Sequence, residues 1–120
     1  MKNIAPNIFR QRLLIEGFYS IEMTKEVIEH YLRGVAKHLD LNTYGEPVIY
    51  SPVSGMGRGE NAGFDAFVPL VDSGISAYVW TGEAFFSIVL YTCKGFDERA
   101  AVDFTSRFFT ATGEVVSFSF

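Results

Sequence analysis

Cysteine and histidine are scarce in this sequence, which has one cysteine and two histidines among 120 residues. A single cysteine cannot form a disulfide within the chain, so a disulfide-stabilised secreted scaffold is excluded and a reducing, cytoplasmic location is expected. His30 and His38 fall in one expected helix, about 12 Å apart along its axis, and Cys93 is distant from both in the sequence. Because metal ligands must converge on one ion, no metal site is expected from these residues.

Long apolar runs and an excess of basic residues are missing as well. No stretch approaches the length of a membrane-spanning helix, and the N-terminal residues contain no hydrophobic region of signal-peptide type. The net charge of −4 disfavours a nucleic-acid-binding protein, which needs a basic surface. The chain does have 48% hydrophobic and 16% aromatic residues, which predict one folded globular domain spanning residues 1–120.

The spacing of apolar residues predicts the order of helices and strands. Alternation indicates strands, whereas helical periodicity indicates two helices that each bury one side, with Ser20 and Asp97 as their N-caps. Because the strands are adjacent and joined by short turns, we expect an α+β fold: a two-layer α/β sandwich with a mainly antiparallel sheet and both helices on one face. The expected elements are a strand within 7–19 that ends near Gly17, a helix ending by Asp40, strands 44–51, 63–72, 75–80 and 84–92, a helix 98–109, and a strand 114–120 whose Val116, Phe118 and Phe120 share one face.

Residues 51–63 form a glycine-rich segment with four glycines. A phosphate-binding loop of this composition is followed by the N-terminus of a helix. Here a strand pattern follows, so nucleotide binding by this segment is disfavoured. Two alternatives remain open: a loop that covers a substrate or is held by Arg58 and Glu60, and an ordinary connection between strands.

Residues 72–95 carry most of the chain's chemically usable groups on one predicted hairpin. Two apolar, aromatic runs flank a short glycine-containing turn at 81–83, a pattern typical of paired antiparallel strands. The only tryptophan, Trp80, lies in the middle of the hairpin, and the only cysteine, Cys93, follows its second strand. At the start of the first strand an acidic residue directly precedes Ser73.

This stretch resembles the core of the bacterial-type S-adenosylmethionine (SAM) decarboxylases, which are small pyruvoyl enzymes of polyamine synthesis. The resemblance needs no gap, and it rests on a serine after an acidic residue, a second serine, a tryptophan and a Thr-Cys pair, which fall on Ser73, Ser76, Trp80, Thr92 and Cys93. The first strand, the first helix and the second strand are similar to those of the family too. The resemblance implies a two-layer α/β sandwich that pairs as a homodimer.

The resemblance also implies a chemistry, in which the family's chain cuts itself before the serine that corresponds to Ser73. The new terminus becomes a pyruvoyl group, which forms a Schiff base with the substrate amine. Two helper positions differ here, because Tyr78 replaces a histidine and Asp65 replaces a serine. A phenol with a reference pKa of about 10 is a poor base at neutral pH. Self-processing is therefore expected to be lost, and no cofactor is expected, although a pyruvoyl group from Ser73 remains the alternative.

Further roles follow from the resemblance for residues that face the substrate. Cys93 corresponds to the cysteine that reprotonates the substrate carbon after CO2 leaves, and Trp80 to the tryptophan that stacks on adenine. Phe85 is close to Trp80 in the sequence, and aromatic faces receive both an adenine and a sulfonium cation. Glu83 is the candidate for a ribose contact, and Ser76 completes the expected substrate-binding set. The alternative for Cys93 and Trp80 is an inert core position.

Three functions remain open from the sequence. In the first, the protein keeps a SAM pocket without pyruvoyl chemistry and acts as a lyase that eliminates or cyclises the aminocarboxypropyl chain, with Tyr78, Asp65 and Glu83 as candidate acid–base groups. In the second, it is a pyruvoyl-dependent SAM decarboxylase in proenzyme form. In the third, it is a catalytically inactive binding or regulatory homologue. The expected partners are SAM or a related nucleoside and a second copy of the chain, with no nucleic acid and no membrane.

Overall fold

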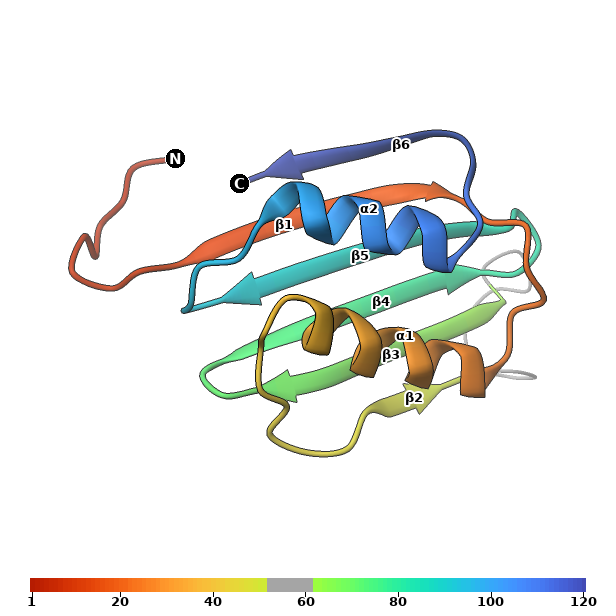
Figure 1. Cartoon of the computed structure of the whole chain (residues 1–120), viewed down its shortest axis with the longest axis horizontal. Helices are drawn as coiled ribbons and strands as arrows, with labels where there is room; N and C mark the ends of the chain where they lie inside the picture. The colour runs from red at the N-terminus through yellow and green to blue at the C-terminus, as the bar shows by residue number, and fades with distance from the viewer. Residues whose placement is uncertain (52–61) are drawn as a thin grey trace.

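The computed structural model describes residues 1–51 and 62–120, in which two helices cover one face of a six-stranded sheet (Figure 1). The strand order is β2-β3-β4-β5-β1-β6, and neighbouring strands are antiparallel throughout. The predicted α+β sandwich and the predicted order of elements are therefore confirmed. The elements are β1 (Gln11–Phe18), α1 (Lys25–His38), β2 (Val48–Tyr50), β3 (Gly63–Leu70), β4 (Ser73–Trp80), β5 (Phe85–Thr92), α2 (Glu98–Phe108) and β6 (Thr112–Ser119).

Both helices begin at a side-chain cap, but only one cap agrees with the prediction. Asp97 accepts a hydrogen bond from a first-turn N–H at 3.1 Å and caps α2 as expected. The prediction that Ser20 caps α1 is wrong, because Thr24 accepts the hydrogen bond from the N–H of Val27 at 3.1 Å. The Ser20 hydroxyl instead donates to the carbonyl of Thr110 at 2.7 Å. Ser20 thereby ties the segment before α1 to the end of α2.

The second strand is shorter than the sequence predicts. β2 covers Val48–Tyr50 only, because Pro47 has no N–H for the sheet and the preceding residues form a loop. Thr43 makes an isolated bridge to Leu70 of β3 before that loop. The two alternatives for the glycine-rich segment fall almost entirely outside the described residues, which omit 52–61.

The core lies between the helices and the sheet face that they cover. An aromatic cluster joins the two layers, because the Phe109 ring centroid lies 4.6 Å from that of Tyr31 on α1 and 4.9 Å from that of Phe86 on β5. The buried Tyr31 hydroxyl hydrogen-bonds the Thr105 hydroxyl of α2 at 2.7 Å, and burial raises the pKa of Tyr31. The remaining fully buried large residues are Leu13, Ile15, Ile28, Leu32, Val35, Val68, Ile75, Ile88 and Leu90.

We expect the substitution Phe109→Ala to lower the free energy of unfolding by about 3–5 kcal/mol, because it leaves a cavity between the rings of Tyr31 on α1 and Phe86 on β5. The matched control is Phe9→Ala, since Phe9 precedes the sheet and is exposed; its effect should stay within about 0.5 kcal/mol. Urea denaturation followed by circular dichroism measures both values. Equal effects of the two substitutions would contradict the central role of Phe109.

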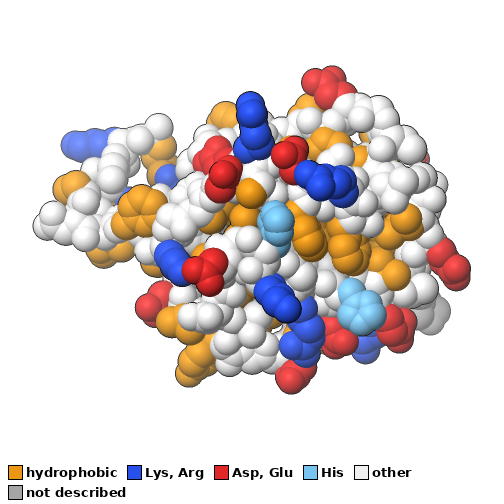
Figure 2. Space-filling model, viewed as in Figure 1, with side chains coloured by type: hydrophobic (Ala, Val, Ile, Leu, Met, Phe, Trp, Pro, Cys, Tyr) orange, Lys and Arg blue, Asp and Glu red, His pale blue; other side chains and the backbone are white. Residues whose placement is uncertain are grey.

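The outer surfaces of the helices are polar, as their periodicity predicts. Figure 2 views this side and shows Lys, Arg, Asp and Glu spread over it, with histidine at two separate places. His30 and His38 are both exposed on α1. Within residues 1–51 and 62–120, neither helix has the length and apolar character needed to cross a membrane.

The other face of the sheet has no helix over it (Figure 1), and we call it the open face. Val116, Phe118 and Phe120 share this face as predicted, and they are 50%, 63% and 47% exposed. Strand registers place further apolar side chains beside them, and exposed apolar area of this extent marks an interaction surface. The open face consists of Arg12, Leu14, Glu16, Phe18, Val48, Tyr50, Asp65, Phe67, Ser76, Tyr78, Trp80, Phe85, Ser87, Val89, Tyr91, Val116, Phe118 and Phe120.

Candidate functional site

Ser73 and Cys93 meet at one end of the sheet. β4 begins at Ser73 and β5 ends at Thr92, and the antiparallel register pairs Gly74 with Tyr91, so the two strand ends lie side by side. The backbone N–H of Cys93 donates a hydrogen bond to the Ser73 hydroxyl oxygen at 2.8 Å. The hairpin therefore brings together two of the residues that the sequence singles out.

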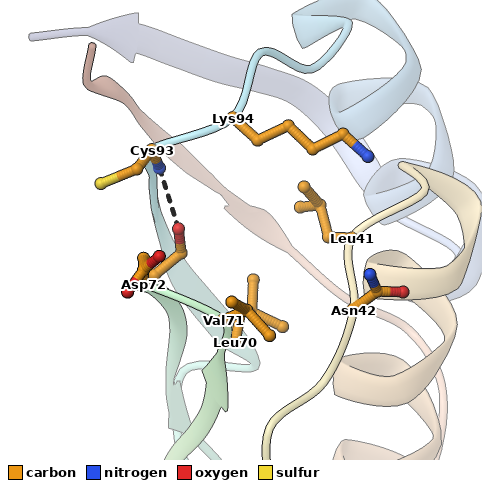
Figure 3. A pocket seen from close by; sticks show the side chains of 8 residues that line it. Leu41, Asn42, Leu70, Val71, Asp72, Cys93 and Lys94 are labelled. Carbon is orange, nitrogen blue, oxygen red and sulfur yellow. Dashed lines mark hydrogen bonds between the residues drawn. The ribbon is translucent and has the colours of Figure 1, made fainter. Parts of the chain in front are cut away.

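A cleft of about 220 Å³ opens beside this pair (Figure 3). Its apolar wall includes Leu41 and Leu70, and its polar side chains come from three separate segments. The Cys93 sulfur points away from Lys94 and Leu41 (Figure 3), although Cys93 is among the residues that line the cleft. The residues lining the cleft are Leu41, Asn42, Leu70, Val71, Asp72, Ser73, Cys93 and Lys94.

Lys94 and Asn42 are cleft residues that the sequence reasoning missed. The Lys94 ammonium donates to the backbone carbonyl of Asp40 at 2.8 Å and lies 3.5 Å from its carboxylate. Asn42 follows α1 and reaches the cleft only because the helix ends above the turn between β3 and β4. Lys94 could have been found by its place next to Cys93, whereas no sequence signal connects Asn42 to the hairpin.

Tyr78, Asp65 and Ser76 form a second group on the open face. The register pairs Asp65 with Tyr78, and both line a shallow depression of about 290 Å³ together with Ser76 and Tyr50. Tyr78 is five residues from Ser73 along an extended strand, which corresponds to about 17 Å. Within one protomer, neither Tyr78 nor Asp65 therefore reaches the Ser73 hydroxyl.

Trp80, Phe85 and Glu83 form a third group at the opposite end of the hairpin. The rings of Trp80 and Phe85 have centroids 5.4 Å apart, and the exposed Glu83 lies in the turn between them. Trp80 is seven residues from Ser73, or about 23 Å along the strand. Trp80 and Phe85, which the sequence assigns to the same substrate as Cys93, therefore do not lie beside Cys93 within a single protomer.

Ionisable groups gather in the cleft without forming a metal centre. Among residues 1–51 and 62–120, no three His, Cys, Asp or Glu side chains come close enough to hold a metal ion. Asp72 and Lys94 supply one negative and one positive charge at the cleft. Asp72 occupies the tight turn before β4 with a φ of +58°, a left-handed conformation that Asp and Asn tolerate better than most residues. A polar, mixed-charge cleft of this kind suits a small zwitterionic group.

Comparison with known proteins supports the fold. No protein-family model matches the sequence, and no curated protein does either. Among solved structures, the adenosylmethionine decarboxylase from Aquifex aeolicus superposes with a TM-score of 0.71 at 18% sequence identity, over 94% of this chain and 89% of that chain. The chain thus shares its fold with an adenosylmethionine decarboxylase over nearly its whole length.

Proposed function

We propose that the protein binds SAM and cleaves or cyclises its aminocarboxypropyl chain without a pyruvoyl group. The observation that carries the proposal is the polar cleft at Ser73 and Cys93, in a fold shared with an adenosylmethionine decarboxylase. A sulfonium is a good leaving group, so a binding site that orients the chain supplies much of the catalysis. The fold neighbour's substrate class agrees with this proposal, and the changed residues Tyr78 and Asp65 argue for a different reaction.

Both proposed reactions release methylthioadenosine, and neither needs a cofactor. In cyclisation, a carboxylate oxygen of the substrate attacks the carbon bonded to sulfur, the C–S bond breaks, and its electron pair leaves on the sulfur of methylthioadenosine. The other product is homoserine lactone. In elimination, a base removes a proton from the neighbouring carbon, a C=C bond forms, and the same C–S bond breaks. Asp65 is the proposed base for elimination, and Tyr78, its partner in the β3–β4 register, is proposed to orient it.

The surroundings of Ser73 support the proposed loss of pyruvoyl chemistry. To attack the preceding carbonyl, the Ser73 hydroxyl must lose its proton to a base. Its hydrogen bond to Cys93 does not supply one, because the hydroxyl oxygen accepts that bond from the backbone N–H. Tyr78 has a high reference pKa and lies about 17 Å away in the same protomer. Ser73 is therefore proposed to line the SAM site as an intact residue.

We further propose that two copies pair through their open faces and complete each other's site. A two-fold axis between the sheets and perpendicular to the strands lays the Trp80 end of one sheet over the Ser73 end of the other. Packed sheets lie about 10 Å apart, so side chains from both can contact one ligand. Trp80 and Phe85 of one protomer then receive the adenine, while the amino-acid end passes around the ends of β4 and β5 into the partner's cleft, which opens on the helix side of the sheet.

The proposed function is tested by incubating the protein with SAM and separating the products by chromatography. We expect methylthioadenosine to accumulate, and intact-mass spectrometry of the same sample to show one uncleaved species near 13.4 kDa. The control is the Cys93→Ala variant, which keeps the fold because Cys93 is exposed. It should bind SAM but turn it over more slowly. A protein that neither binds nor converts SAM refutes the proposal.

A decarboxylase is the second candidate, and it is favoured by the position of Cys93 next to Ser73 at the paired strand ends, where the resemblance places the reprotonating cysteine. That function predicts two fragments from a cut between Asp72 and Ser73, together with decarboxylated SAM. SAM binding with no product of either kind would instead identify an inactive binding or regulatory homologue. The same assay therefore separates all three functions.

A further inference from the structure

The cleft beside Ser73 is too small for a whole nucleoside. Sites for ligands of drug size occupy about 300–1,000 Å³, and this cleft has about 220 Å³. It therefore suits a short polar fragment, and the aromatic pair Trp80 and Phe85 lies at the far end of the hairpin. If SAM binds as proposed above, the fragment left for the cleft is its aminocarboxypropyl end.

The cleft presents opposite charges from two segments. Asp72 comes from the turn between β3 and β4, and Lys94 from the segment after β5; Figure 3 shows them on different sides of the cleft. We propose that these residues bind the zwitterionic α-amino-acid end of the ligand, with Lys94 on the carboxylate and Asp72 on the ammonium. This inference rests on the proposed function and adds the residues that recognise the amino-acid end.

Lys94 is free to exchange its present contact for a ligand. Its side chain is 60% exposed and the Asp40 carboxylate is 97% exposed, and such surface ion pairs contribute little to stability. The backbone carbonyl of Asp40 holds the ammonium at the cleft margin. A ligand carboxylate that is partly shielded by Leu41 and Leu70 is therefore a stronger partner than the exposed Asp40 side chain.

An ammonium group bound to the substrate carboxylate affects which reaction the substrate can undergo. A carboxylate held by an ammonium is stabilised as an anion in the ground state, and that interaction is lost when CO2 leaves. By the same argument Lys94 opposes both decarboxylation and attack by the carboxylate itself, because each reaction removes the anion, whereas elimination breaks the C–S bond and keeps the carboxylate charged. The same residue that selects SAM thus directs the reaction toward C–S cleavage by elimination.

The test is isothermal calorimetry with three probes: SAM, decarboxylated SAM, and methylthioadenosine. Decarboxylated SAM lacks only the carboxylate, whereas methylthioadenosine lacks the whole amino-acid end. The Lys94→Met variant should bind SAM about tenfold more weakly and decarboxylated SAM unchanged. Lys94→Arg should retain SAM binding. Asp72→Asn, which suits the left-handed turn, should weaken SAM and decarboxylated SAM alike and leave methylthioadenosine unaffected. The control is Lys25→Met at the far end of α1.

Each outcome is decisive. Loss of affinity for SAM alone in Lys94→Met, with recovery in Lys94→Arg, supports the assignment. If Lys94→Met binds all three probes as the unaltered protein does, or weakens all three equally, the assignment is wrong while the proposed SAM function stands. If the unaltered protein binds none of the probes, the proposed function fails, and this inference fails with it.

Discussion

Replacing Val116 and Phe118 together with arginine is expected to convert the proposed dimer to a monomer of 13.4 kDa and to abolish the proposed action on SAM. Both side chains lie on the open face, far along the sheet from the cleft, and at least half of each is exposed. Burying an apolar side chain of this size stabilises a contact by about 1.5–3 kcal/mol. Because only about half of each side chain is left exposed in the monomer, the four side chains lost from a dimer remove about 3–6 kcal/mol, which weakens dimerisation by about 10²–10⁴-fold.

Two arginines per copy add a further penalty. The residues of the open face include few charges, and its Glu16 already accepts a hydrogen bond from Ser87 at 2.7 Å. An arginine at position 118 loses hydration against a partner's apolar surface, and an arginine at position 116 can pair with Glu16, which lies opposite it, only as an ion pair withdrawn from water at a desolvation cost. Because the site is proposed to need both copies, activity should fall in parallel with the dimer fraction.

The control variant is Tyr44→Arg. Tyr44 is an aromatic residue that is 76% exposed, and it lies on the loop before β2, outside the open face. Sedimentation velocity and the methylthioadenosine assay are applied to both variants. Tyr44→Arg should remain dimeric and active. A monomeric unaltered protein, or a monomeric arginine variant with full activity, would remove the support for a shared site.

Most of the fold can be predicted from the sequence because its elements are specified by local patterns. The alternation of Val116, Phe118 and Phe120 assigns one face of β6, and the apolar stripe through Tyr31 and Val35 assigns the buried side of α1. The N-cap of α1 is harder to predict, since Ser20 and Thr24 both precede the helix and both residue types can cap a helix. A tertiary contact decides between them, because the Ser20 hydroxyl donates its hydrogen bond to the carbonyl of Thr110.

The candidate site is less predictable because it is made from segments that are distant in the sequence. The pairing of Ser73 with Cys93 follows from the hairpin, whereas Asn42 enters the cleft only through the placement of α1. The separation of Trp80 from Ser73 was already implied by the sequence, because an extended strand of seven steps spans about 23 Å. Residues of one hairpin are close in the sequence, but those at its two ends are far apart in space.

The face-to-face dimer makes a sharper prediction about how the two groups of site residues cooperate. In one chain Cys93 and Tyr78 lie on the same hairpin but not in the same cavity, because Tyr78 faces the depression with Asp65. If the partner's Tyr78 serves the cleft at Cys93, each site combines residues of two chains. A heterodimer of two differently altered chains then contains one intact site and one doubly altered site.

We therefore expect Cys93→Ala and Tyr78→Phe to be at least about 100-fold less active when each is expressed alone, and to regain activity when the two chains are mixed. Random pairing makes half of the dimers heterodimers, so about a quarter of all sites are restored. The measurement is methylthioadenosine release after the two variants are unfolded and refolded together. Refolding Cys93→Ala with a chain carrying both substitutions is the matched control and restores no site. Native mass spectrometry shows whether the mixture contains heterodimers. If it does and the mixture stays inactive, Tyr78 and Cys93 do not form one site across the interface, because such a site would regain its activity in the heterodimer.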